Sequence, residues 1–248
     1  LGASNLTLAF PRLLSSLSNW FEGPLEIDVA HGHGRSYGRW SRVGLRALPG
    51  IVECRLWEDL ASATPADETC GLVTDIGNDI LYESGIDEIV EWLTACVDRL
   101  REHGARIAMT RLPLASVSRL SSWRYRLGRS ILFPGCRLTL AEVLARAEQL
   151  DAAIGDLAGK CDITLVEPER DWYWLDAIHI DRRWRSTAWR RFLAATLDRD
   201  DVPAFPRVSL SRSIRTWRLR PSERAWCGKL EAVEQPVFER DNVTVRLY

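Results

Sequence analysis

Short apolar segments alternate along this chain with longer amphipathic ones, and this alternation restricts the possible folds more than any other feature. Strand-like segments are expected at 25–30, 70–75, 105–110 and 161–166, and helices at 86–103, 140–157 and 183–197, the first of them from apolar residues that repeat at intervals of three and four. Glycine at position 104 is well placed to end the first of these helices. Strands separated by helices favour a parallel sheet that is covered on both faces. The sequence therefore predicts an α/β domain over residues 1–202.

The less regular segments give weaker predictions. Residues 1–9 are expected to form the end of a strand and a turn, 11–20 a helix, 51–56 a short strand, and 115–137 an irregular stretch. Residues 203–248 are expected to form extended segments, as a C-terminal β-type extension packed on the same domain. A strand leading to position 4 would have only three residues here, so we expect the natural protein to begin upstream and this chain to be a trimmed version.

Composition argues against several classes of partner. Hydrophobic residues make up 46% of the 248 positions, enough for a core, and the net charge of −1 gives no bulk attraction to nucleic acid or to anionic membranes. No apolar run approaches the ~20 residues of a membrane span. The six cysteines include no CxxC pair, so we interpret them as small apolar residues in a reducing compartment, which favours the cytoplasm. Their even number also permits disulfides.

Four loops carry polar residues where strands are expected to end, which is where α/β sheets place their sites. They are Gly2-Ala3-Ser4-Asn5, the glycine-rich segment 31–38 (HGHGRSYG), Asp75-Ile76-Gly77-Asn78-Asp79, and Asp176-Ala177-Ile178-His179. The first and last of these loops are separated by most of the chain. The sequence thus offers a serine and a histidine that only folding could bring together.

The order and spacing of these loops over residues 1–197 resemble the SGNH (GDSL-like) hydrolase family. Ser4 matches the first block, although Ala3 stands where the family usually has Asp, and Gly34 matches the second block best, with Gly32 and Gly38 as alternatives. Asn78 matches the third block, and the pair Asp176 and His179 matches the last. The resemblance implies a three-layer α/β/α sandwich of flavodoxin-like type and a serine esterase that needs no cofactor. Its substrate would be a small-molecule ester, an acetylated sugar or a lipid, and the sequence does not choose among them.

The chemistry of these residues agrees with that expectation. A serine hydroxyl needs a base within hydrogen-bond reach, which His179 can provide while Asp176 holds the other ring nitrogen. The backbone N–H groups of Ser4 and Gly34 and the side-chain amide of Asn78 are candidate donors to the oxyanion. Position 6 is leucine, so this is not the G-x-S-x-G turn of α/β-hydrolases.

Each of these residues also has a structural interpretation. Ser4 could cap a helix, residues 77–79 could form an ordinary turn, and His179 could be a structural histidine. If so, the chain would be a catalytically inactive binding module with the same fold.

Other polar and aromatic clusters also have two interpretations. His31 and His33 would need a third ligand to bind a metal, and the sequence shows none, so we predict loop histidines and no metal site. Trp172 and Trp174, with Tyr173 between them, are candidates for an aromatic wall of the substrate pocket. The Arg/Trp-rich segments 123–129 and 181–191 could contact an anionic or sugar substrate, or could be solvated helix faces. Nucleic-acid binding through these segments is disfavoured by the net charge.

Overall fold

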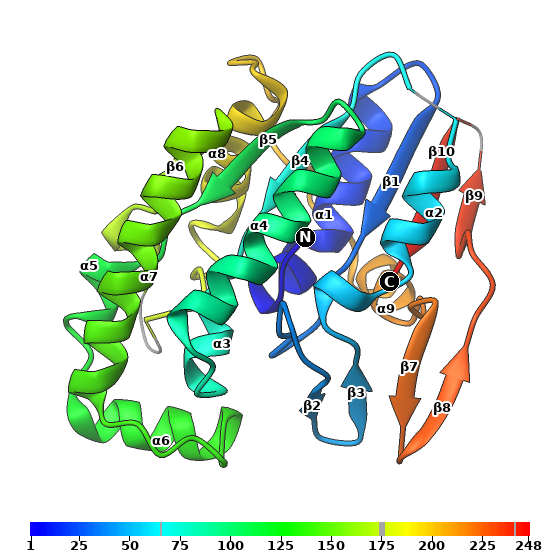
Figure 1. Ribbon diagram of the computed structural model, residues 1–248. Helices are drawn as coiled ribbons and strands as arrows, with labels where there is room; N and C mark the ends of the chain where they lie inside the picture. Colours follow the sequence, from blue (N-terminus) through cyan, green and yellow to red (C-terminus); the bar gives the residue numbers. More distant parts are fainter. Residues whose placement is uncertain (65, 174–176, 241) are drawn as a thin grey trace.

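The computed structural model describes residues 1–248 except 65, 174–176 and 241, and it shows a mixed α/β fold (Figure 1). Its central parallel sheet has the strand order β4–β5–β6. These strands are β4 (Cys70–Val73), β5 (Arg106–Thr110) and β6 (Thr164–Val166). The register pairs Cys70 with Arg106 and Ala108 with Thr164. The carboxyl ends of the three strands therefore lie at one edge of the sheet.

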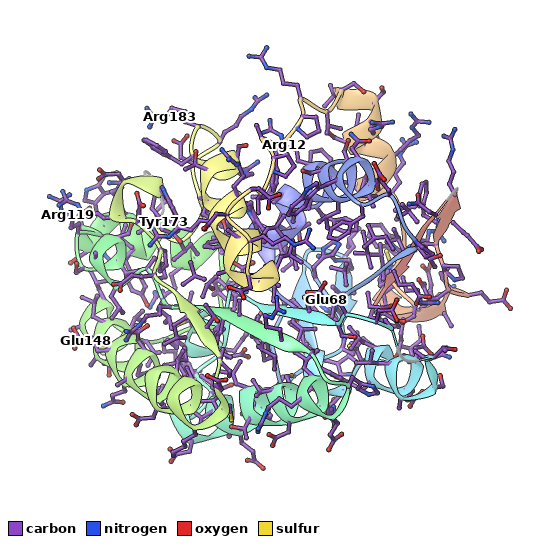
Figure 2. All side chains as sticks on the ribbon, turned by 90° about the horizontal axis from the view of Figure 1, so that it is seen from above. Arg12, Glu68, Arg119, Glu148, Tyr173 and Arg183 are labelled. Carbon is purple, nitrogen blue, oxygen red and sulfur yellow. The ribbon has the colours of Figure 1, made fainter. Side chains whose placement is uncertain are left out.

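Helices cover both faces of this sheet, as the view from above shows (Figure 2). The long helices α4 (Ile86–Glu102) and α7 (Leu140–Cys161) pack against each other on one face. Helix α8 (Arg185–Leu197) packs against all three strands on the other face. The sequence correctly predicted these three helices, and the apolar repeat of 86–103 is the side of α4 that is buried.

Six further helices are found among the described residues, and all but α1 are shorter than these three. They are α1 (Ser4–Trp20), α2 (Leu56–Ser62), α3 (Asn78–Leu81), α5 (Leu114–Val117), α6 (Ser122–Leu132) and α9 (Leu210–Trp217), with single 3-10 turns at Ile51–Glu53 and Arg170–Trp172. Among the described residues, no helix combines the length and apolar character needed to cross a bilayer.

A second sheet joins the two ends of the chain. Its strands are β1 (Leu25–Val29), β10 (Val243–Leu247) and β9 (Phe238–Arg240). Strand β10 runs parallel to β1 and antiparallel to β9. The buried residues of β10, which are Val243, Val245 and Leu247, face a core shared with α1 and α8. The C-terminal strand is thus a neighbour of the first strand of the chain.

A third, antiparallel sheet lies at the lower end of the molecule in Figure 1. It has the order β2–β3–β7–β8, from β2 (Ser41–Val43), β3 (Arg46–Leu48), β7 (Glu223–Trp226) and β8 (Lys229–Ala232).

The first two residues of the chain hydrogen-bond to the central sheet, at β4, and to the second sheet, just after β1. The Leu1 amino group donates to the Leu72 carbonyl at 2.7 Å, and the Leu1 carbonyl accepts from Thr74 N–H at 3.0 Å. Gly2 N–H donates to the Ala30 carbonyl at 3.0 Å. Ser4 is consequently positioned from both the β1 and the β4 sides.

Four local predictions were wrong. Residues 4–10 belong to helix α1, because the Asp75 carboxylate accepts hydrogen bonds from N–H groups at its start. Residues 51–56 form a 3-10 turn that leads into α2, not a strand; the Ile51 carbonyl there accepts from Trp57 Nε1. The stretch 115–137 holds α5 and α6 instead of being irregular, and 210–217 forms α9 instead of extended chain. Tertiary contacts outweigh local propensity in such short segments.

The cysteines are free thiols with different exposures. Cys54, Cys96 and Cys136 are buried in the core, as the sequence predicted, Cys70 and Cys161 are half-buried, and Cys227 is exposed.

Candidate functional site

The structure brings Ser4 and His179 into direct contact although 175 positions separate them. Ser4 is the first residue of α1, and its hydroxyl lies 2.8 Å from Nε2 of His179. His179 lies in the loop between the 3-10 turn Arg170–Trp172 and α8. Ser4 is only 8% exposed, so this hydrogen bond is largely shielded from water. A serine beside an imidazole in a partly buried site is the arrangement that nucleophilic catalysis requires.

The turn in front of Ser4 is fixed by Asp75. One oxygen of this carboxylate accepts from the N–H groups of Ala3 at 2.9 Å and Leu6 at 3.1 Å. Asp75 adopts a left-handed backbone conformation, with φ of 59°, which is uncommon for a residue with a side chain. Negative charge at a helix N-terminus is favourable, so Asp75 stabilises the start of α1. Ala3 itself is fully buried.

Asn5 connects the Ser4 helix to the His179 loop. Its side-chain nitrogen donates to Asp75 Oδ1 at 2.7 Å and to the Ile178 carbonyl at 2.9 Å, and its side-chain oxygen accepts from Ile180 N–H at 2.8 Å. The residues on either side of His179 are therefore held by one side chain. Sequence reasoning missed both Asn5 and the capping role of Asp75, although both are polar residues inside the recognised loops.

The three proposed oxyanion donors differ in whether they already donate a hydrogen bond within the protein. Asn78 donates one side-chain hydrogen to the Arg35 carbonyl at 3.1 Å, and it lines the same pocket as Ser4. Gly34 has φ of 62°, and its carbonyl accepts from Tyr82 Oη at 2.6 Å. Within the described part of the chain, no acceptor is found for the backbone N–H of Ser4 or of Gly34. Ser4 lines that pocket, whereas Gly34 is not among the residues that line it.

The alternatives for the glycine of the second block are tightly packed. Gly38 donates its N–H to Ser36 Oγ at 3.1 Å, and a Cβ there would lie 2.0 Å from the Trp92 ring. A Cβ on Gly32 would lie 2.3 Å from Leu48. Close packing is thus a sufficient reason for glycine at positions 32 and 38.

Asp79 attaches the glycine-rich loop to α3. Its carboxylate accepts from Ser36 Oγ, and from Tyr37 N–H at 2.8 Å. The side chain is fully buried, and this burial raises its pKa to about 6 despite both hydrogen bonds. Asp79 follows Asn78 directly, so it helps to set the position of the Asn78 amide relative to the loop.

The two loop histidines occupy different environments. Nδ1 of His31 lies 2.9 Å from Thr7 Oγ1, and burial lowers the pKa of His31 to about 3. His33 is exposed; partial desolvation and then the positive charges of Arg46 and His179 lower its pKa. No group of three metal-binding side chains occurs among the described residues.

A pocket of about 100 Å³ lies beside Ser4. Polar groups of Ser4, Thr74 and Asn78 line one part of it. Asn5, Asp75, Thr110 and Arg111 also line it. Its apolar lining is formed chiefly by Ile80, Leu112, Val117, Val143 and Ala147. These apolar residues come from α3, α5, α7 and the loop after β5, which places the pocket at the carboxyl edge of the central sheet.

The aromatic residues near the last block do not share one location. Tyr173 lines the pocket, whereas Trp172 is 1% exposed and packs edge-on against Phe192 in the core. Trp174 and Asp176 lie outside the described residues, so their proposed roles remain predictions.

Comparison of the chain with family models, with curated proteins and with solved structures finds no match.

Proposed function

We propose that this protein is a serine hydrolase of the SGNH type that cleaves carboxylic esters. The observation that carries the proposal is the 2.8 Å contact between the Ser4 hydroxyl and the His179 imidazole beside an apolar pocket. The covered parallel sheet supports the finer fold assignment, a three-layer α/β/α sandwich with the site at its carboxyl edge.

The proposed reaction has two steps. His179 takes the proton of Ser4 as its oxygen attacks the ester carbonyl, and the protonated imidazole then gives that proton to the departing alcohol. An acyl group is left on Ser4. Water, deprotonated by His179, attacks this acyl group; the bond to Ser4 Oγ breaks, the acid is released, and the protonated imidazole returns the proton to Ser4. Asp176 is the predicted partner of the other imidazole nitrogen.

Negative charge on the carbonyl oxygen would be stabilised by the backbone N–H groups of Ser4 and Gly34 and by the Asn78 amide. The first two have no acceptor among the described residues, and the third has one hydrogen left. Losing one donor of this kind typically costs about 3–4 kcal/mol of barrier.

The pocket favours a short, uncharged acyl group. Its lining is mostly apolar, and its volume of about 100 Å³ is below the ~150 Å³ of a cavity that holds benzene. We therefore expect acetyl to butyryl esters to react faster than octanoyl esters.

Labelling with a fluorophosphonate, followed by peptide mapping, tests the proposal. The modification should fall on Ser4, and Ser4→Ala should lose at least about a thousand-fold in p-nitrophenyl acetate hydrolysis. Ser18→Ala, on the far part of the same helix, is the matched control and should keep full activity. A folded wild-type protein that neither labels nor hydrolyses would instead identify an inactive binding module.

A further inference from the structure

The segment 111–141 is strongly basic although the net charge of the whole chain is close to zero. It contains six arginines, at 111, 119, 124, 126, 129 and 137, and no Asp or Glu, in a chain of net charge −1. Arg119, Arg126 and Arg137 are exposed and form no ion pair among the described residues, whereas Arg111 pairs with Asp151. Local positive charge is therefore concentrated around α6.

Helix α6 also carries a stripe of large apolar side chains in contact with solvent. Trp123, Leu127 and Ile131 follow one another at intervals of four residues, which places them on one side of the helix. Their exposed fractions are 62%, 56% and 69%. A soluble domain normally buries such a stripe, so an exposed one indicates an interaction surface.

The opposite side of α6 attaches the helix to the protein. Tyr125 is buried, and its hydroxyl donates to the Leu138 carbonyl at 2.7 Å; Arg129 donates to the same carbonyl at 3.2 Å. The stripe is not needed for these contacts. It can therefore engage a partner without unfolding the helix.

Helix α6 lies at the lower end of the molecule, where the β2–β3 and β7–β8 hairpins also end (Figure 1). It follows α5, whose residues Leu114 and Val117 line the pocket beside Ser4. Arg119, between α5 and α6, points outward at the edge of the molecule (Figure 2). The basic, apolar surface thus adjoins the site.

We infer that α6 binds the surface of an anionic lipid bilayer, with Trp123, Leu127 and Ile131 in the headgroup region and the surrounding arginines on lipid phosphates. Tryptophan and leucine together with arginine on one helix are typical of such binding. Arg126 is exposed and follows Trp123 by three residues, so it lies beside the stripe and not on the attached side. The absence of acidic residues from the segment provides the charge complementarity, and the apolar stripe distinguishes a bilayer from a nucleic acid. This inference goes beyond the proposed hydrolysis and does not depend on it.

Co-sedimentation with vesicles tests the inference. The protein should bind vesicles of phosphatidylcholine that contain roughly 30 mol% phosphatidylglycerol, because this anionic lipid attracts basic segments. It should bind vesicles of pure phosphatidylcholine far less. Arg119→Gln with Arg126→Gln should weaken binding by about thirty-fold, since each arginine contributes about 1 kcal/mol. Trp123→Ala with Leu127→Ser should weaken it at least about ten-fold.

Leu210→Ser on α9 is the matched control, because Leu210 is 72% exposed on another arginine-bearing helix, and binding should be unchanged. Circular dichroism should show all variants folded. The inference is overturned by absence of binding to anionic vesicles, or by equal loss in the Leu210→Ser protein. A third result also overturns it: only the arginine substitutions weaken vesicle binding, and the protein binds single-stranded RNA more tightly than vesicles. That result would identify a phosphate-binding face.

Discussion

At the scale of residues, the site depends on side chains that hold Ser4 and His179 in place without reacting themselves. Asn5 bonds to the backbone on both sides of His179, and Asp75 bonds to Asn5 and to the start of α1. These hydrogen bonds connect α1, the segment after β4 and the loop that holds His179. We interpret Asn5 as a positioning residue.

Replacing Asn5 with alanine should lower kcat by about ten- to a hundred-fold with little change in KM. The substitution leaves the Ile178 carbonyl and the Ile180 N–H without their partner, and small misplacements of a catalytic group can cost a hundred-fold in rate. Steady-state kinetics and the rate of fluorophosphonate labelling measure the effect. Asn19→Ala, at an exposed position of the same helix, should change neither. A lower melting temperature with unchanged kcat would show that Asn5 is only structural.

Ala147→Leu should shorten the acyl group that the protein accepts. Ala147 is buried in α7 and lines the pocket, so a larger side chain would fill part of a cavity of about 100 Å³. The rate with p-nitrophenyl hexanoate should fall at least about ten-fold relative to that with the acetate, a loss of about 1.4 kcal/mol in transition-state binding. Ala152→Leu, exposed on the same helix, should leave the ratio of the two rates unchanged. Equal loss with both esters would argue against an acyl pocket here.

At the scale of elements, the glycine-rich loop and α3 act as one unit because Asp79 joins them. Ser36 and Tyr37 donate to the buried carboxylate, and Asn78 donates back to the loop at Arg35. Ordering a glycine-rich loop costs conformational entropy, and these hydrogen bonds offset part of that free-energy cost. The connection is made at the cost of burying an ionisable group.

That burial gives a pH dependence with a definite sign. The pKa of Asp79 is about 6 in the folded protein and near 3.8 when unfolded, so between these values the folded state keeps a proton that the unfolded state has released. Stability from this group is present below pH 4 and is lost as the pH rises to about 6. The unfolding free energy of wild type minus that of Asp79→Asn should fall by up to about 3 kcal/mol between pH 4 and pH 7. Urea titrations measure it, and a pH-independent difference would contradict the assignment.

At the scale of the whole molecule, both ends of the chain are hydrogen-bonded to other strands. Strand β10 lies in register beside β1, while Leu1 and Gly2 hydrogen-bond towards β4 and β1 respectively. Charge is also unevenly distributed at this scale. The net charge of −1 correctly describes the total but not the basic segment around α6. Bulk charge therefore does not exclude an electrostatic interaction with one face.

The sequence alone determined the longer regular elements, namely α4, α7 and α8 and the strands β1, β4, β5 and β6, although β6 is shorter than the predicted strand 161–166. Each has enough residues of one pattern for local physics to select its conformation. It also identified the segments that hold Ser4, Asn78 and His179, because polar residues after apolar segments are conspicuous.

Only the tertiary structure decided the rest. Helix α1 begins at Ser4 because Asp75, some seventy positions away, caps it, and no local pattern encodes that partner. The Asn5 hydrogen bonds, the burial of Trp172 and the helical state of residues 210–217 likewise depend on neighbours distant in sequence. The physical reason is that short or polar segments gain too little from local interactions to fix their own conformation, so long-range contacts choose it for them.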